Sequence, residues 1–284
     1  LVSDNSLIYC LIFGGHYTLK ENITAYLNFQ ADDVMMQWVP QLILENLARD
    51  QNPSVRSGVA AYDNVSEAIL NKLAKDEDVV VRCSVACNPK VSLRILEILV
   101  IDEDRRVRCQ IAQYSTSLAL LERLASDKEI HVRKCVAQNP AISFPILEKM
   151  ATDDSSGVRQ EIAKNPSAPI QVLAHLSTDQ DHSVLKSLFE NPTTPSSILM
   201  GILNNVDLGF RKNIAQFVTS NGLILDWLSE DKVDDIKSCV AMNRMTPTPV
   251  LSKLSNDRVG SVRRSVAINP STPEFILEKL AGDV

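Results

Sequence analysis

An arginine motif returns along the chain at an almost constant spacing. Its clearest copy lies in residues 127–140, with Asp127 six residues before Arg133 and Asn139-Pro140 following it. The arginine slot recurs every 26 residues, apart from one step of 25 between Arg108 and Arg133. The slot holds Arg56, Arg82, Arg108, Arg133, Arg159, Leu185, Arg211, Lys237 and Arg263. Repetition with a period of roughly 20 to 50 residues indicates a solenoid, in which each unit packs only on its neighbours.

Each repeat predicts two short helices. The first carries Val-Arg-x-x-Val-Ala over about two turns and stops at Asn-Pro, because the residue before proline leaves the helical region and asparagine tolerates a left-handed cap. The second follows Thr-Pro, as at Thr246-Pro247, where we expect threonine to cap the helix and proline to occupy its first turn. It continues as Ile-Leu-x-x-Leu-Ala, which forms one apolar stripe. These patterns predict an all-α chain.

The repeats also predict the domain organisation. Residues 1–28 match no repeat, and their apolar content suits a segment that caps the open end of the stack. Residues 29–54 form a degenerate first repeat, and residues 55–284 hold the clear repeats. No linker or low-complexity segment interrupts them, so we predict one continuous domain over residues 29–284, an α-solenoid of about ten two-helix repeats.

Together these motifs resemble the leucine-rich repeat variant family, well over residues 55–284 and weakly over residues 29–54. The resemblance implies a right-handed superhelix built from two layers of short helices. The spacing of aspartate and arginine is also similar to that of HEAT-like repeats, whose Asp and Arg bridge neighbouring units, and this similarity places the first helix in the concave layer. The founding type of the family carries an iron–sulfur cluster on N-terminal cysteines. Residues 1–54 hold only Cys10 here, so we expect no cofactor.

The acidic slot six residues before each arginine predicts a structural ladder. A turn carboxylate can accept hydrogen bonds from backbone N–H groups and from a bidentate guanidinium, which would fix the stacking angle. Only Leu185 and Asn205 break the pattern seriously, and Lys237 keeps the charge without the planar fork. The predicted ladder residues are Asp50, Arg56, Asp76, Arg82, Asp102, Arg108, Asp127, Arg133, Asp153, Arg159, Asp257 and Arg263.

The slots one and five residues after the arginine predict a groove surface, because they lie one helical turn apart and would face the concave side. In the middle of the chain they are rich in lysine and glutamine, although the formal net charge is −6. We predict a partner-binding strip that favours an acidic or extended peptide. An ordinary solvated face explains the same residues. The strip comprises Lys134, Gln138, Gln160, Lys164, Lys186, Lys212, Gln216 and Arg264.

The six cysteines lack CxxC spacing and predict a reduced, cytoplasmic protein. Cys83 and Cys87 are four residues apart on one helix, and Cys109 occupies the Cys83 slot one repeat later. A metal or redox role for these three is a weaker alternative, because packed helices lie ~8–10 Å apart whereas zinc holds sulfur at ~2.3 Å. We therefore expect no metal site.

Our first hypothesis is a non-enzymatic, monomeric scaffold that binds a protein or peptide partner along the groove. The chain shows no glycine-rich phosphate loop, Gly-x-Ser-x-Gly or His-Glu-x-x-His motif, so we do not expect an enzyme. The alternative is nucleic-acid binding in the same groove, as in HEAT-like DNA glycosylases, but the net acidity counts against it. No apolar run reaches the roughly 18 residues of a membrane span, and no signal peptide is expected.

Overall fold

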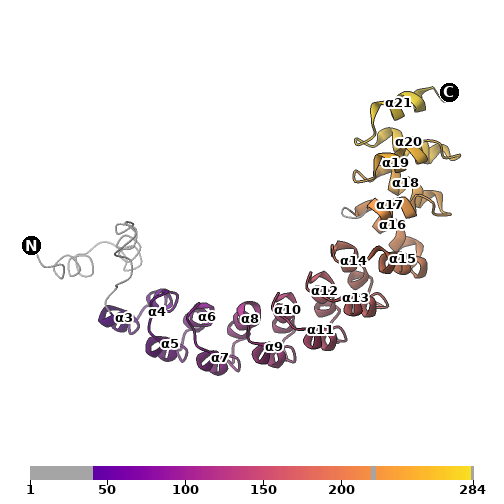
Figure 1. Cartoon of the computed structure of the whole chain (residues 1–284). Coiled ribbons are helices and arrows are strands. Elements are labelled where there is room, and N and C mark those ends of the chain that lie inside the picture. Colours follow the sequence, from indigo (N-terminus) through magenta and orange to yellow (C-terminus); the bar gives the residue numbers. More distant parts are fainter. Residues whose placement is uncertain (1–40, 219–221, 283–284) are drawn as a thin grey trace, which may run out of the picture. The chain divides into compact units, whose positions relative to one another are not determined.

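The computed structural model describes residues 41–218 and 222–282 (Figure 1). These residues form nineteen helices, α3 to α21, and no strand. The chain divides into two compact units, unit 1 (Leu1–Ala141) and unit 2 (Ile142–Val284). The predicted cap at residues 1–28 and the beginning of the degenerate repeat lie outside the described residues.

The helices follow the predicted two-helix pattern. The described helices of unit 1 are α3 (Gln41–Leu47), α4 (Pro53–Ala60), α5 (Glu67–Leu73), α6 (Val79–Cys87), α7 (Leu93–Leu99), α8 (Arg105–Tyr114), α9 (Leu118–Leu124) and α10 (Ile130–Gln138). Those of unit 2 are α11 (Phe144–Met150), α12 (Ser156–Lys164), α13 (Ile170–Leu176), α14 (His182–Glu190), α15 (Ser196–Asn205), α16 (Leu208–Phe217), α17 (Gly222–Leu228), α18 (Asp234–Met242), α19 (Thr248–Leu254), α20 (Gly260–Ile268) and α21 (Glu274–Ala281). The even-numbered elements from α4 on are the first helices of the repeats, and the odd-numbered ones are the second helices.

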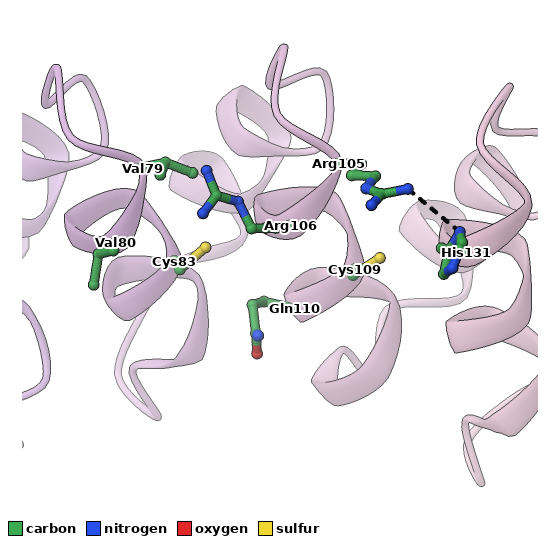
Figure 2. A pocket seen from close by; sticks show the side chains of 8 residues that line it. All are labelled: Val79, Val80, Cys83, Arg105, Arg106, Cys109, Gln110 and His131. Atoms are coloured by element: carbon green, nitrogen blue, oxygen red, sulfur yellow. Dashed lines mark hydrogen bonds between the residues drawn. The ribbon is translucent and has the colours of Figure 1, made fainter.

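Consecutive first helices lie side by side within each unit. Examples are α6 beside α8 and α18 beside α20, while a second helix such as α9 packs on the first helices before and after it. Equivalent slots therefore line up, so that Cys83 of α6 and Cys109 of α8 lie at matching places one repeat apart (Figure 2). The prediction of an all-α stack of two-helix repeats is confirmed. Its handedness, its concavity and its continuity as one domain stay predictions.

Small and branched apolar side chains fill the space between the helices. Val81, Val85 and Ala86 are buried on the first helix α6, and Leu121 and Leu124 are buried on the second helix α9. Burying a side chain of the size of leucine contributes about 1.5–3 kcal/mol, and a helix of seven residues can obtain it only from its neighbours. Among the described residues, no helix is long and apolar enough to cross a membrane.

Two predictions about helix ends are wrong. Asn88, which ends α6, has φ −66° and ψ 128°, so it is extended rather than left-handed. Before α19 the cap position is taken by Pro247, and the preceding Thr246 is buried, with its hydroxyl donating to the carbonyl of Val240 at 2.5 Å. Asn88 donates to the carbonyls of Ala60 and Tyr62 in the preceding repeat and accepts from the Lys90 N–H, while Thr246 donates to the preceding helix α18 and not to α19.

Candidate functional site

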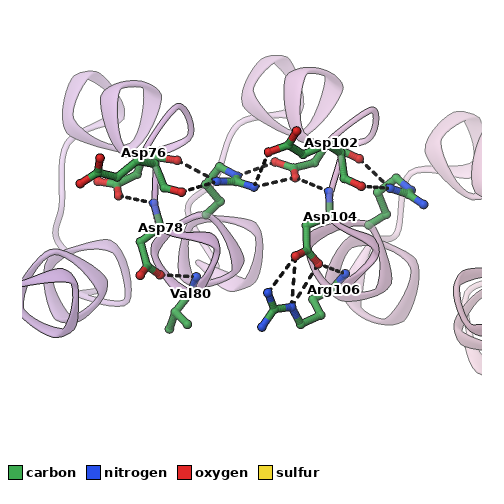
Figure 3. A network of polar contacts seen from close by, with 10 residues as sticks. Asp76, Asp78, Val80, Asp102, Asp104 and Arg106 are labelled. Atoms are coloured by element: carbon green, nitrogen blue, oxygen red, sulfur yellow. Dashed lines mark hydrogen bonds and ion pairs between the residues drawn. The ribbon is translucent and has the colours of Figure 1, made fainter.

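In most repeats the arginine binds the aspartate of the next repeat. Arg82 donates from Nε to Asp102 Oδ2 at 2.7 Å and from Nη2 to Asp102 Oδ1 at 3.0 Å (Figure 3). Its Nη1 donates to the backbone carbonyl of Asp76 at 2.8 Å. The aspartate six residues before the arginine thus supplies a carbonyl, and the aspartate twenty residues after it supplies the carboxylate. One guanidinium connects two successive turns.

The aspartates of the ladder also organise their own turns. Asp102 Oδ1 accepts a hydrogen bond from the backbone N–H of Asp104 at 2.9 Å, and Asp76 does the same for Asp78 (Figure 3). Burial acts to raise the pKa of Asp76, but hydrogen bonds from Arg56 and from the Asp78 N–H outweigh it, and the pKa lies below its ordinary value. The hydrogen bond to Asp102 raises the pKa of Arg82. Folding therefore favours the charged forms of Asp76 and Arg82.

The remaining ladder residues follow this geometry with three variations. The same bidentate pairing joins Arg56 to Asp76, Arg108 to Asp127 and Arg159 to Asp179. The carbonyls of Asp50, Asp102, Asp127, Asp153 and Asp257 accept from Arg56, Arg108, Arg133, Arg159 and Arg263 respectively. Lys237 contacts both Asp257 and Asp234 at 2.7 Å. Arg211 reaches Asp231 at 3.1 Å, while Leu185 is buried and brings no charge to its slot.

The asparagine that follows most first helices, usually before proline, forms a second ladder that the sequence analysis missed. Asn139 Nδ2 donates to the carbonyls of Ala112 and Ser115 at 2.7 and 2.9 Å, both in the preceding repeat. Equivalent bonds to the preceding repeat are made by Asn88, Asn191, Asn243 and Asn269. The recurrence of asparagine at this slot is the sequence signal for the ladder, but a local capping role accounts for the same recurrence.

The Lys/Gln strip lies on the outward side of the first helices. The slot five residues after the arginine is exposed in every described repeat, as at Gln138 on α10 and Lys164 on α12. The slot one residue after the arginine is half-buried at Lys134 and Gln160. Within unit 2 the exposed members of the strip are Lys164, Lys186, Lys212, Gln216 and Arg264.

Two lysines of the strip face carboxylates. Lys164 lies 3.0 Å from Glu190, which occupies its equivalent slot on the next first helix. Lys212 lies 3.1 Å from Asp235, and this contact raises the pKa of Lys212. Lys186, by contrast, is exposed on α14 and has no hydrogen-bonding or charged partner among the described residues.

A hollow of about 370 Å³ lies over α6, α8 and α10 in unit 1 (Figure 2). Arg105, Arg106 and His131 are on its wall. Arg106 is held by the carboxylate of Asp104, with Nη2 2.8 Å from Oδ2. Arg105 Nη1 lies 3.4 Å from His131 Nδ1.

Two of the three cysteines considered for a metal or redox role line this hollow, Cys83 and Cys109. Burial raises the pKa of the Cys83 thiol to about 11. A hydrogen bond with Cys135 raises the pKa of Cys109, and burial adds to that increase. Cys87 instead donates to Gln110 Oε1 at 2.9 Å. In the part of the chain that the structure describes, no three His, Cys, Asp or Glu side chains form a group that could hold a metal ion.

A smaller hollow of about 130 Å³ lies between α14 and α16 in unit 2. Phe189, Ile214 and Val218 contribute apolar surface to it. The exposed side chains at its wall are Lys186, Glu190 and Phe217. This hollow adjoins the Lys/Gln strip, since Lys186 belongs to both. No sequence motif indicated it.

No family model matches the chain, and no curated protein matches it. Among solved structures, the chain is similar to a leucine-rich repeat variant described as having a novel repetitive structural motif. The two are 24% identical, the match covers 81% of each chain, and the TM-score is 0.45. The assignment of the fold rests on the helical repeats described above.

Proposed function

We propose that the chain is a non-enzymatic scaffold that binds an acidic, extended segment of a partner protein on the first helices of unit 2. The observation that carries the proposal is the regular exposure of the strip. The buried face of each first helix is occupied by the core and the ladder, while the slot five residues after the arginine always reaches solvent. A repeat stack presents such slots in a row, which suits a long ligand more than a small one.

Charge supports an acidic ligand. The strip in unit 2 exposes four cations, Lys164, Lys186, Lys212 and Arg264, and two carboxylates pair with them, Glu190 and Asp235. Exposed ion pairs contribute only about 0–1 kcal/mol, so carboxylates of a partner can replace them at little cost. The ladder arginines are already bound to aspartates and take no part.

A cytoplasmic location belongs to the same proposal. The five described cysteines, at 83, 87, 109, 135 and 239, form no disulfide. Free thiols suit a reducing compartment.

The test is binding of a labelled, unstructured, aspartate-rich peptide, followed by fluorescence anisotropy at low salt. We expect binding to the wild-type chain, weakening as salt is added, and loss of binding in the triple variant Lys186→Glu, Lys212→Glu, Arg264→Glu. The matched control changes three lysines of second helices in the same unit, Lys149→Glu, Lys253→Glu and Lys279→Glu, and should keep binding. Equal effects of the two triple variants would refute a role for the first helices.

Single-stranded and duplex DNA of matched charge serve as the competing ligands. Counterion release makes nucleic-acid binding fall steeply with salt. DNA binding tighter than that of the acidic peptide, lost in the same triple variant, would replace the proposed partner by a nucleic acid.

A further inference from the structure

The interface between α14 and α16 departs from every other repeat in its packing residues. The slot four residues after the arginine is alanine in all other repeats, and it is Phe189 here. The slot before the arginine is valine or isoleucine elsewhere, and it is Phe210 here. Both rings are buried, and their centroids lie 6.1 Å apart. Phe210 also meets His182 edge-on, with ring centroids 4.9 Å apart.

Both polar ladders are interrupted at the same interface. Leu185 takes the arginine slot on α14. Asn205, in the acidic slot, is the last residue of α15, and its amide donates to the carbonyl of Gly201 within that helix. Val218 takes the cap position after α16 where the other ladder places asparagine. Across this interface the rings of Phe189 and His182 contact Phe210, and His182 Nε2 lies 3.6 Å from Asp207 Oδ2 at the N-cap of α16.

Larger rings and missing ladders explain why a hollow opens here. Within unit 2, α14 and α16 approach each other closely at fewer positions than α12 and α14, α16 and α18, or α18 and α20. The space left between them is the hollow of about 130 Å³. At its wall Phe217, in the slot six residues after the arginine that holds asparagine in most repeats, ends α16 and is 57% exposed. A large ring with that much exposed apolar surface favours burial by a ligand.

We propose that this hollow is the anchor pocket for one large apolar side chain of the acidic partner segment. The inference rests on the proposed function and specifies where that segment gains its affinity. A cavity of ~150 Å³ is enough to hold a benzene ring, so the hollow suits a phenylalanine or leucine side chain. Lys186 at the wall would bind a carboxylate next to the anchor, while Glu190 is already neutralised by Lys164 at 3.0 Å.

Two labelled peptides test the pocket on the full chain. Both carry the same aspartate-rich sequence, and they differ only by phenylalanine or serine at the centre. Burial of one aromatic ring predicts that the phenylalanine peptide binds roughly ten- to a hundred-fold more tightly. The variant Phe217→Ser should remove most of that difference while leaving the binding of the serine peptide unchanged. The matched control is Phe275→Ser on the second helix α21, because Phe275 is 58% exposed and lies away from the hollow.

The outcomes separate this inference from the proposal beneath it. If both peptides bind the wild-type chain equally, the pocket is refuted and the acidic-segment scaffold stands. If the phenylalanine peptide keeps its advantage in Phe217→Ser, or loses it equally in Phe275→Ser, the anchor lies elsewhere and the inference is overturned. If neither peptide binds at low salt, both proposals fall.

Discussion

Arg82 and Asp102 belong to successive repeats, and their side chains form a bidentate ion pair with N–O distances of 2.7 and 3.0 Å. Both side chains are almost fully buried, with 10% and 8% of their surface exposed. The remaining nitrogen of Arg82 donates to the carbonyl of Asp76, so one side chain fixes the relative position of two turns. Similar pairs recur along both units and define how each repeat sits on the next.

Breaking this buried pair should destabilise the folded chain much more than breaking an exposed pair. Arg82→Ala leaves the buried carboxylate of Asp102 without its main partner, and we expect a loss of about 3–5 kcal/mol in the free energy of unfolding. Arg82→Lys should cause a smaller loss than Arg82→Ala, because it keeps the charge but not the planar fork of donors. The control is Arg106→Ala, whose side chain is 61% exposed in its pair with Asp104, with an expected loss of about 0–1 kcal/mol. Urea unfolding measures all three, and equal losses for Arg82→Ala and Arg106→Ala would contradict the ladder.

The asparagine ladder predicts a second destabilisation. Asn139→Ala removes two hydrogen bonds to the carbonyls of Ala112 and Ser115 and leaves polar groups buried, which costs about 1–3 kcal/mol. Asn256→Ala is the matched control, because Asn256 is exposed. Its amide donates to Ser252 within its own repeat, and the bond it accepts from Lys279 of the next repeat lies in solvent. Thermal unfolding, followed by circular dichroism, compares the two variants. A decrease in the unfolding temperature that is no larger for Asn139→Ala than for Asn256→Ala would show that the ladder does not stabilise the fold.

Acid should weaken the stack at low pH only. Burial opposes ionisation of Asp76, Asp179 and Asp257, but hydrogen bonds from Arg56, Arg159 and Lys237 hold their pKa values below the ordinary 3.8. A carboxylate whose pKa is lowered by folding contributes its stability above the pKa of the unfolded chain and loses it as the pH falls through the folded value. This contribution should therefore be constant from pH 7 to 5 and decrease below about pH 4.

The unfolding temperature measured across that range checks the prediction. Asp179→Asn, which lacks one of these carboxylates, should show a smaller decrease with acid than the wild-type chain. A wild-type unfolding temperature that is unchanged, or higher, at pH 3 would contradict the assigned ion pairs.

Thiol labelling should follow exposure and burial. Cys87 is exposed, whereas Cys239 is only 4% exposed, and burial raises the pKa of both thiols. We expect an alkylating reagent at neutral pH to modify Cys87 first and Cys239 only after denaturant is added, because the thiolate is the reactive form. Peptide mass spectrometry at timed intervals gives the order. Rapid native labelling of Cys239 would mean that α18 does not pack as described.

Periodicity predicted the helices and the exposed slots because both depend on residues close together in sequence. The exposure of Lys164 and Gln138, for example, follows from their place on a helix whose other side is apolar. Handedness and concavity do not follow from such local patterns. Predicting which aspartate pairs with each arginine likewise requires the stacking distance between repeats.

The missed features all depend on contacts between repeats. The Asn139 side chain accepts from the Ala141 N–H in its own turn and donates to the carbonyl of Ser115 in the preceding repeat, and only the second bond depends on how the helices pack. Phe189 is visible in the sequence as a departure from alanine, but its effect depends on Phe210 one repeat later. Arg105 and His131, which contact each other, also belong to two different first helices. Local sequence contains no information on which neighbour fills the space.

Photocrosslinking tests the central claim most directly. The acidic phenylalanine peptide, with a benzophenone group beside its central residue, is irradiated with the full chain, and the adducts are mapped by mass spectrometry. Binding along the first helices predicts adducts on α14 and α16, competed by the unlabelled peptide and absent from the Lys186→Glu, Lys212→Glu, Arg264→Glu variant. Competed adducts on the second helices of unit 2, or on unit 1 alone, would contradict it.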